Sequence, residues 1–208
     1  KEVQDFSSLY GFELIDLMPI QGGIQNTNYF LVGKAGAHYV LTIFEDMDEH
    51  SASELVPVLE HLGQAGLAVP VPLRFAGKAI HSLKDKPAQI APRMLGEHPM
   101  PASLAQVEQI AIAQAKMHVA LQGFPLQRTA YRDHDYWHAV AKELQPTLTL
   151  ADLMLFCYFL GIYEVMTQMY PNRPKGFIHS DLFRDNTLFV VYQLTGILDF
   201  YELNQDEL

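Results

Sequence analysis

Several features that particular protein classes require are scarce in this sequence. Its 208 residues include one cysteine, Cys157, which excludes an intramolecular disulfide or a cysteine-based metal cluster and suits a reducing compartment. This cysteine lies in the apolar stretch LMLFCYFLGIY, so we expect it to be buried. Lysine and arginine number 14 against 24 aspartates and glutamates, which gives a formal net charge of -10. The negative balance argues against a dedicated nucleic-acid-binding protein, because such a protein needs a basic surface.

The sequence also has little that indicates export or membrane insertion. The first residues, KEVQDFSSLYGF, have no apolar core of the kind found in signal peptides. The longest apolar run, around Leu153–Tyr163, is too short to cross a bilayer. We therefore expect a cytoplasmic protein without a membrane partner, and the sequence carries no signal of an oligomeric state. Because 49% of the residues are hydrophobic, the chain can form the core of one domain or of two small lobes.

Strand patterns dominate the first part of the chain. Short segments rich in β-branched and aromatic residues alternate with glycine-containing turns. They comprise residues 13–20, 26–33 and 37–45, and further strands are expected within 69–95. The second and third segments should pair as a hairpin. A helical pattern over 51–67, with Ser51 or Ser53 as N-cap and Pro57 inside it, interrupts the strands.

Helical patterns dominate the second part. Residues 103–121 have apolar positions spaced by threes and fours, which predicts an amphipathic helix with Leu104, Val107 and Met117 on its core face. Residues 148–170 are apolar almost all round and should form a central helix. We therefore predict an α+β fold, with an antiparallel-sheet lobe containing one helix over 1–92 and a mainly helical lobe over 93–208.

One segment near the C-terminus looks irregular. The stretch LFVVYQLTGILDF has the composition of two successive strands, but no glycine, proline, asparagine or aspartate separates them. Tight hairpins need such residues. The pattern suggests that residues are missing near Val190–Tyr192 and after Tyr201, which would leave the second lobe incomplete.

A polar loop between two apolar segments carries the clearest chemical signal. In GFIHSDLFRDNTLF, His179 and Asp181 precede Asn186, and Asp199 then ends the apolar strand GILDF. H-x-D-x-x-x-x-N followed by such a strand is the arrangement of the kinase catalytic loop and metal-binding aspartate. Asp181 would accept the proton of the attacking hydroxyl, while Asn186 and Asp199 would supply oxygen ligands to Mg²⁺ on the phosphates. His179 would orient the loop by hydrogen bonding. Any one of these residues alone would fit an ordinary turn, but the complete set favours phosphoryl transfer.

A glycine pair lies upstream, between two strand patterns. Gly22 and Gly23, in IQGGIQNTNYFL, would let backbone amides approach phosphates closely. A Gly-Gly hairpin is common, so this signal depends on its place ahead of the catalytic loop. Asn26 and Asn28 could bond a phosphate or the substrate, or could close the turn.

Five segments together resemble the bacterial homoserine kinases, which belong to the aminoglycoside-phosphotransferase-like branch of the protein-kinase-like fold. From about Gly22 to Tyr201 these segments are GGIQNTNYFL, YVLTIFE, APRMLGEHP, GFIHSDLFRDNTLF and GILDFYE. The resemblance implies a two-lobed kinase fold whose first lobe binds the nucleotide. It also implies ATP- and Mg²⁺-dependent phosphorylation of the hydroxyl of L-homoserine, which gives O-phospho-L-homoserine in threonine biosynthesis.

The resemblance also suggests where the nucleotide lies and where this chain departs from the wider pattern. The adenine would lie near the hinge residues Pro92, Arg93 and Met94, with Val40 and Leu198 as apolar walls. The third-strand lysine that binds phosphates in kinases would fall in YVLTIFE, where this chain has Thr42. Mg²⁺ and backbone amides would then neutralise more of the phosphate charge. Glu54, the counterpart of the lysine's usual glutamate partner, should be solvated.

Arg184 and the choice of substrate leave alternatives open. Arg184 could bind the substrate carboxylate or the γ-phosphate, or could form a salt bridge with Asp185 or Asp181. A choline or aminoglycoside kinase of the same fold is a second interpretation, and the aromatic residues around Trp137 would suit choline, although packing also explains them. A catalytically inactive nucleotide-binding module is a third. Thr42 supports this third interpretation, while the intact catalytic loop argues against it.

Overall fold

The chain folds into two compact units. The computed structural model describes residues 1–21, 25–130 and 132–208. The first unit comprises Lys1–Leu126 with His179–Glu202, and the second comprises Gln127–Ile178 with Leu203–Leu208. Because 179–202 belongs to the first unit, the polar loop and the N-terminal strands are parts of one compact body.

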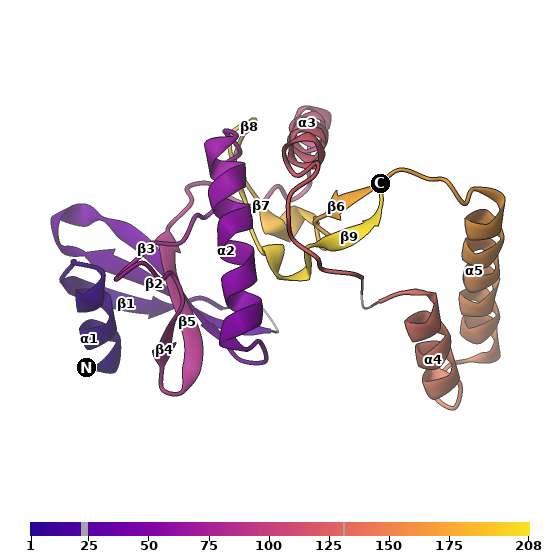
Figure 1. The fold of residues 1–208 in the computed structure, drawn as a ribbon, viewed down its shortest axis with the longest axis horizontal. Coiled ribbons are helices and arrows are strands. Elements are labelled where there is room, and N and C mark those ends of the chain that lie inside the picture. Colours follow the sequence, from indigo (N-terminus) through magenta and orange to yellow (C-terminus); the bar gives the residue numbers. More distant parts are fainter. Residues whose placement is uncertain (22–24, 131) are drawn as a thin grey trace. The chain divides into compact units, whose positions relative to one another are not determined.

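A five-stranded antiparallel sheet is the framework of the first unit (Figure 1). Its strands are β1 (Leu14–Pro19), β2 (Asn26–Gly33), β3 (His38–Phe44), β4 (His81–Leu83) and β5 (Lys86–Pro92), in the order β1-β2-β3-β5-β4. The predicted strands over 13–20, 26–33 and 37–45 are confirmed, and so is the hairpin between β2 and β3. Within 69–95 the strands are β4 and β5, and the Lys84-Asp85 turn between them has positive φ at both residues.

The two faces of this sheet pack against different helices (Figure 1). Leu31, Leu41 and Ile90 are fully buried on one face, against Phe6 of helix α1 (Glu2–Leu9). Phe44 packs on the other face with residues of helix α2 (Glu49–Gln64). The sequence analysis missed α1, which is short and carries only a few apolar residues.

Helix α2 begins earlier than the sequence suggested. Its N-cap is Asp48, whose carboxylate accepts a hydrogen bond from the backbone N–H of Ser51 at 2.8 Å. The prediction that Ser51 or Ser53 caps the helix is therefore wrong, because the aspartate satisfies the free amide first and places Ser51 inside the first turn. Pro57 lies within the helix.

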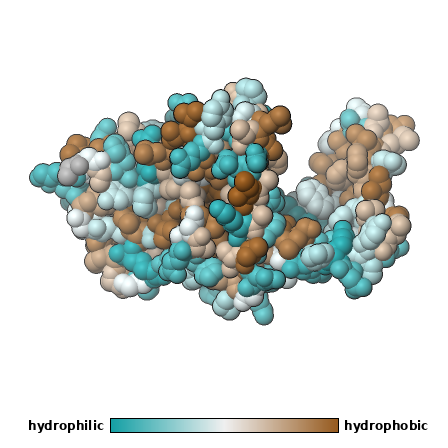
Figure 2. Space-filling model, turned by 90° about the horizontal axis from the view of Figure 1, so that it is seen from above, coloured by the Kyte–Doolittle hydropathy of each residue, from teal (hydrophilic) through white to brown (hydrophobic). Residues whose placement is uncertain are grey.

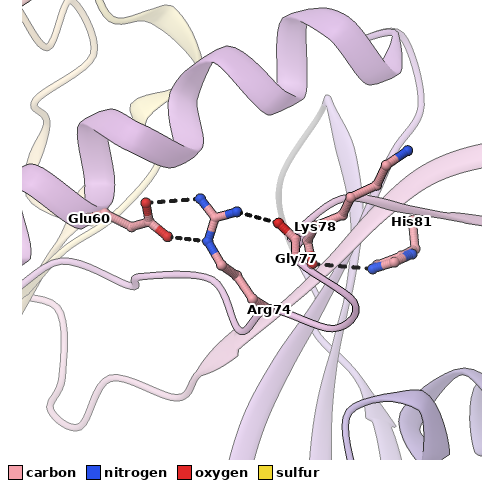
Figure 3. A network of polar contacts seen from close by, with 5 residues as sticks. All are labelled: Glu60, Arg74, Gly77, Lys78 and His81. Atoms are coloured by element: carbon pink, nitrogen blue, oxygen red, sulfur yellow. Dashed lines mark hydrogen bonds and ion pairs between the residues drawn. The ribbon is translucent and has the colours of Figure 1, made fainter.

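An ion pair ties α2 to the irregular segment that leads to β4 (Figure 3). The Arg74 guanidinium donates to both carboxylate oxygens of Glu60, at 2.6 and 3.0 Å, and to the Gly77 carbonyl at 2.7 Å. Beyond it, His81 lies 3.2 Å from the Lys78 carbonyl oxygen. The bidentate geometry makes this a stronger contact than a typical surface ion pair.

We expect Arg74→Ala to lower the free energy of unfolding by about 1 to 2 kcal/mol, because it removes a bidentate ion pair together with a loop hydrogen bond. Lys34→Ala breaks a single, more exposed pair with Glu13 and should change stability by less than about 0.5 kcal/mol. Urea unfolding of both variants measures the difference. Equal effects would contradict the prediction.

A helix and a second hairpin complete the first unit. Helix α3 (Leu104–Ala120) starts with a capping box made by Ser103 and Gln106. The predicted core face of this helix is only partly correct, since Met117 is buried whereas Leu104 is 89% exposed. The face that a helix buries depends on its neighbours as well as on its spacing.

Strands β7 (Thr187–Val190) and β8 (Gln193–Ile197) form this second hairpin. They do so although no glycine, proline, asparagine or aspartate lies between them. The turn consists of Val191 and Tyr192, and Val191 has a φ of 58°. A β-branched residue rarely adopts this conformation, so the turn is strained. The hairpin thus forms without the glycine or asparagine that tight turns prefer, and Val191 takes the strained conformation that glycine would take without strain.

The second unit contains helices α4 (His134–Leu144) and α5 (Leu150–Met169) and a small antiparallel sheet. Its strands are β6 (Lys175–Ile178) and β9 (Asn204–Glu207). An ion pair between Arg173 and Glu207, at 2.5 Å, supports this sheet. The sequence analysis did not predict β9, because the segment NQDE has no strand pattern.

The burial of α5 differs from expectation. Only 6% of its most apolar window is buried, and Figure 2 shows apolar side chains at the surface of this unit. Cys157 is exposed as well, so the predictions of a central helix and a buried cysteine are wrong. An apolar helix is buried only where another element covers it. By length and composition, α5 is also the one helix of the described residues that could cross a membrane, since it extends beyond the run at Leu153–Tyr163.

Candidate active site

His179 joins the polar loop to the segment that leads to Asp199. The imidazole is 2% exposed, its Nε2–H donates to the Leu198 carbonyl at 2.8 Å, and its Nδ1 accepts from the Asp181 backbone N–H at 3.3 Å. Burial lowers the pKa of His179, which keeps the ring neutral and preserves both bonds. Both ring nitrogens of His179 are therefore engaged by backbone groups, as a residue that orients the loop would require.

Asp181 and Asn186 are directly connected. The Asn186 Nδ2 donates to the Asp181 carbonyl at 2.7 Å and to its carboxylate Oδ2 at 2.8 Å. The short helix η2 (Arg184–Asn186) brings the two side chains together across the turn. Because the amide nitrogen faces Asp181, the Asn186 side-chain oxygen is the atom that could bind a cation.

Asp199 has the environment of a carboxylate that needs a cation. Its Oδ1 is buried and has no hydrogen-bond partner among the residues that the structure describes, and its backbone φ is 60°. Burial raises the pKa of Asp199 to about 6, and the negative charge of Asp181 adds to the effect. An unpaired buried oxygen close to another carboxylate is costly, and a divalent cation would remove that cost.

The donor set suits Mg²⁺ in particular. In the part of the chain that the structure describes, no group of three histidine, cysteine, aspartate or glutamate side chains could enclose a metal ion. Mg²⁺ does not need such a cage, because it is commonly held by one or two protein oxygens together with substrate phosphates. Asp199 and Asn186 fit this role.

The sheet face that carries Phe44 also carries the predicted residues of β2 and β3. Thr42 pairs with Asn28 across the strands, and its hydroxyl donates to the Asn28 Oδ1 at 2.8 Å. Val40 lies two residues before Thr42 on the same face, where it pairs with Phe30. Asn26 lies on this face by alternation, at the start of β2. Gly22 and Gly23 lie outside the described residues.

The predicted hinge residues meet this face and the second hairpin. The Arg93 guanidinium lies over the Phe30 ring, 4.0 Å from its centroid. Met94 packs against Gly196 of β8 so closely that a Cβ at Gly196 would come within 3.1 Å of the Met94 Cβ. Pro92 is the exposed last residue of β5. The predicted hinge residues thus contact both the five-stranded sheet and the β7-β8 hairpin of the first unit. Leu198, the predicted apolar wall, follows directly after β8.

Arg184 and Glu54 lie at the surface. Arg184 is exposed and lines a hollow of about 410 Å³ together with Leu182, Phe183 and Asp185. The Glu54 carboxylate is 3.8 Å from the Nδ1 of His50 in the preceding turn of α2, and it remains partly solvated, as expected.

One residue of this region was missed by the sequence analysis. Tyr201, in helix η3 (Phe200–Glu202), hydrogen-bonds through its hydroxyl to the side chains of Thr42 and Gln89. Burial raises the pKa of Tyr201, so its hydroxyl stays protonated. Its only sequence signal is an aromatic residue two positions after Asp199.

The second unit has a separate aromatic hollow. Trp137 of α4 and residues of α5 surround a space of about 450 Å³. The lining residues are Arg132, Trp137, Phe156, Phe159, Leu160, Tyr163 and Asp206. Trp137 itself lies within α4 and is 37% exposed.

These features define a kinase-like α+β fold, and solved structures have the same fold. The chain is similar to the amicoumacin kinase hAmiN in complex with AMP-PNP and Ca²⁺, with a TM-score of 0.72, 17% identity, and coverage of 99% of this chain and 64% of that one. It is also similar to the spectinomycin phosphotransferase APH(9)-Ia in complex with ADP and spectinomycin, with a TM-score of 0.69, 14% identity, and coverage of 98% and 69%. The prediction of a protein-kinase-like fold is confirmed.

The chain belongs to the phosphotransferase enzyme family, which matches residues 16–205. It is 35% identical over 203 residues to the homoserine kinase of Methylobacillus flagellatus. It is 33% identical over 202 residues to that of Neisseria meningitidis serogroup B. These matches cover 94% and 96% of this chain but 61% and 65% of the two relatives, so the chain spans less than two thirds of their length.

Proposed function

We propose that this protein transfers the γ-phosphoryl group of ATP to the hydroxyl of L-homoserine, with Mg²⁺ as the cofactor. The observation that carries the proposal is the set formed by Asp181, Asn186 and Asp199, in which a buried Asp199 oxygen has no partner within the described ranges 1–21, 25–130 and 132–208. The similarity to two proteins named homoserine kinase supports the choice of substrate.

Asp181 acts as the general base. Its Oδ2 accepts the Asn186 amide hydrogen bond, which orients the carboxylate and leaves the other oxygen for the substrate hydroxyl. As the hydroxyl oxygen bonds to the γ-phosphorus, the bond from phosphorus to the β,γ-bridging oxygen breaks, ADP leaves, and the hydroxyl proton passes to Asp181. His179 keeps this geometry through its bonds to Leu198 and Asp181.

The first lobe, residues 1–92, and the hinge hold the nucleotide. Val40 and Leu198 supply apolar walls, while backbone groups of Pro92, Arg93 and Met94 take the adenine edge. Gly22, Gly23, Asn26, Asn28 and Thr42 are proposed to lie along the phosphates. Mg²⁺, when bound to Asn186 and Asp199, neutralises phosphate charge and aligns the γ-phosphate.

The absence of a lysine at Thr42 makes the cation more important. Threonine carries no positive charge, and the Thr42 hydroxyl donates its hydrogen to Asn28, so the phosphates would depend on Mg²⁺ and on backbone amides. Arg184, exposed beside the loop, provides the cation for the homoserine carboxylate.

A coupled ADP-release assay tests the proposal. We expect turnover with L-homoserine in the presence of ATP and Mg²⁺, and at least about tenfold lower kcat/KM with L-serine, choline or kanamycin, because a polar site rejects ligands that leave its groups unpaired. Preference for choline or kanamycin would keep the phosphotransferase mechanism and overturn the substrate. Nucleotide binding without turnover on any alcohol would favour an inactive module.

A further inference from the structure

A polar row crosses the sheet at the place where kinases carry their charged lysine. Asn28, Thr42 and Gln89 are paired across β2, β3 and β5, so their side chains share one face. Thr42 and Gln89 are each only 6% exposed. Buried polar side chains in a sheet need hydrogen-bond partners.

Tyr201 supplies the partner for this row. Its hydroxyl hydrogen-bonds to Thr42 and Gln89, and Thr42 in turn donates to Asn28. The Tyr201 ring packs edge-on against Phe44, with centroids 5.2 Å apart and planes at 90°. It also contacts the apolar cluster that includes residues of α2. The ring is therefore fixed by packing, and the hydroxyl by hydrogen bonds.

The segment that carries Asp199 is held on both sides of this residue. On one side, the Leu198 carbonyl accepts from His179. On the other side, the Phe200 ring lies 4.6 Å from the His179 ring, and Tyr201 follows. Asp199 has a φ of 60° between these contacts, a conformation that a non-glycine residue keeps only when its surroundings enforce it.

We propose that Tyr201 is a positioning residue for Asp199. Its hydroxyl, bound to Thr42 and Gln89, holds segment 198–201 against the sheet and so presents the Asp199 carboxylate to the cation that accompanies the nucleotide. In protein kinases an ion pair between a β3 lysine and a helix glutamate is required for activity. Here an uncharged contact links the same strand to the metal-binding segment. The inference rests on the proposed phosphoryl transfer.

Tyr201→Phe removes the hydroxyl and keeps the ring. We expect the dissociation constant of Mn²⁺ in the presence of ADP, measured by electron paramagnetic resonance, to rise about five- to tenfold, the effect of losing one buried hydrogen bond. The KM for L-homoserine should stay within about twofold, because the hydroxyl does not face the acceptor. Tyr39→Phe is the matched control: this tyrosine lies on the opposite face of β3, stacked on Phe12, and its variant should bind Mn²⁺ like the wild type.

Thr42→Val tests the same contact by changing the partner of Tyr201 on strand β3. If Tyr201 acts through Thr42, the double variant should bind Mn²⁺ about as weakly as the weaker single variant. Unchanged Mn²⁺ binding in Tyr201→Phe, or equal losses in Tyr39→Phe, would overturn the proposal. Binding of Mn²⁺ and ADP is measured without any turnover. A wild-type protein that binds Mn²⁺ and ADP but phosphorylates no alcohol would therefore refute the proposed function and leave the role of Tyr201 standing.

Discussion

We expect Asp181→Asn to lower kcat for phosphoryl transfer by about a thousandfold, because an amide cannot accept the proton of the attacking hydroxyl. The substitution is nearly isosteric, so the Asn186 side chain can still find an acceptor oxygen and the loop keeps its shape. The KM for ATP should change little, since Asp181 contributes to the reaction rather than to nucleotide binding. The coupled assay measures both constants.

Asp185→Asn is the control for this prediction. It makes the same change of charge four positions along the same loop, on an exposed residue. Its kcat should stay within about threefold of the wild type, as expected for an exposed carboxylate outside the reaction. Mn²⁺·ADP binding by Asp181→Asn should also be retained. An Asp181→Asn protein with more than a tenth of wild-type kcat would rule out Asp181 as the base.

We expect the second large effect from Asp199→Asn, which should lower activity but raise the stability of the metal-free protein. We expect kcat to fall by about a hundred- to a thousandfold, because a principal cation ligand is lost. Without metal, however, the variant should be more stable than the wild type, because the amide carries no negative charge that has to be buried near Asp181.

The pH dependence follows from the sign of the shift. The pKa of Asp199 is raised from 3.8 to about 6 by burial and by the nearby carboxylates Asp181, Glu202 and Asp185. Between these values the folded protein binds more protons than the unfolded chain, so ionisation of Asp199 destabilises the fold as the pH rises. The gain from Asp199→Asn should be near zero at pH 4 and reach about 1 to 2 kcal/mol above pH 6.

Urea unfolding in a chelator at several pH values measures this difference. Asp46→Asn, at an exposed site, should give a constant small effect across the range. A gain for Asp199→Asn that was equal at pH 4 and pH 7 would show that the raised pKa is not its cause. Added Mg²⁺ and ADP should reverse the order, because only the wild type gains stability from the bound cation.

The proximity of Asp181 and Asn186 was predictable because their contact is local. Asp181 and Asn186 are five residues apart, and a hydrogen bond across one turn fixes their relation. The strands β2 and β3 were predictable for a similar reason, because the residue types that favour a strand follow one another directly in the sequence. Asp199 could be named as a candidate cation ligand because it ends an apolar strand in a known order of motifs, and this role stays a prediction.

The contacts that could not be predicted are those between distant segments. The sequence places Tyr201 two residues after Asp199, but only the folded sheet brings it to Thr42 and Gln89. The N-cap of α2 was misassigned because aspartate and serine compete for the same amides, and local sequence does not decide between them. The unpaired Asp199 oxygen likewise becomes visible only when its burial is known.

By itself, the sequence determined the kinase-like order of elements and the identity of the chemical groups, because both depend on residues close together in the chain. The tertiary structure decided which side chains are buried. Helix α5 is apolar all round, yet its residues and Cys157 are largely exposed, because burial depends on what packs against a helix. The same reason gives Asp199 its raised pKa: the charge comes from the sequence, and the cost of burying it comes from the fold.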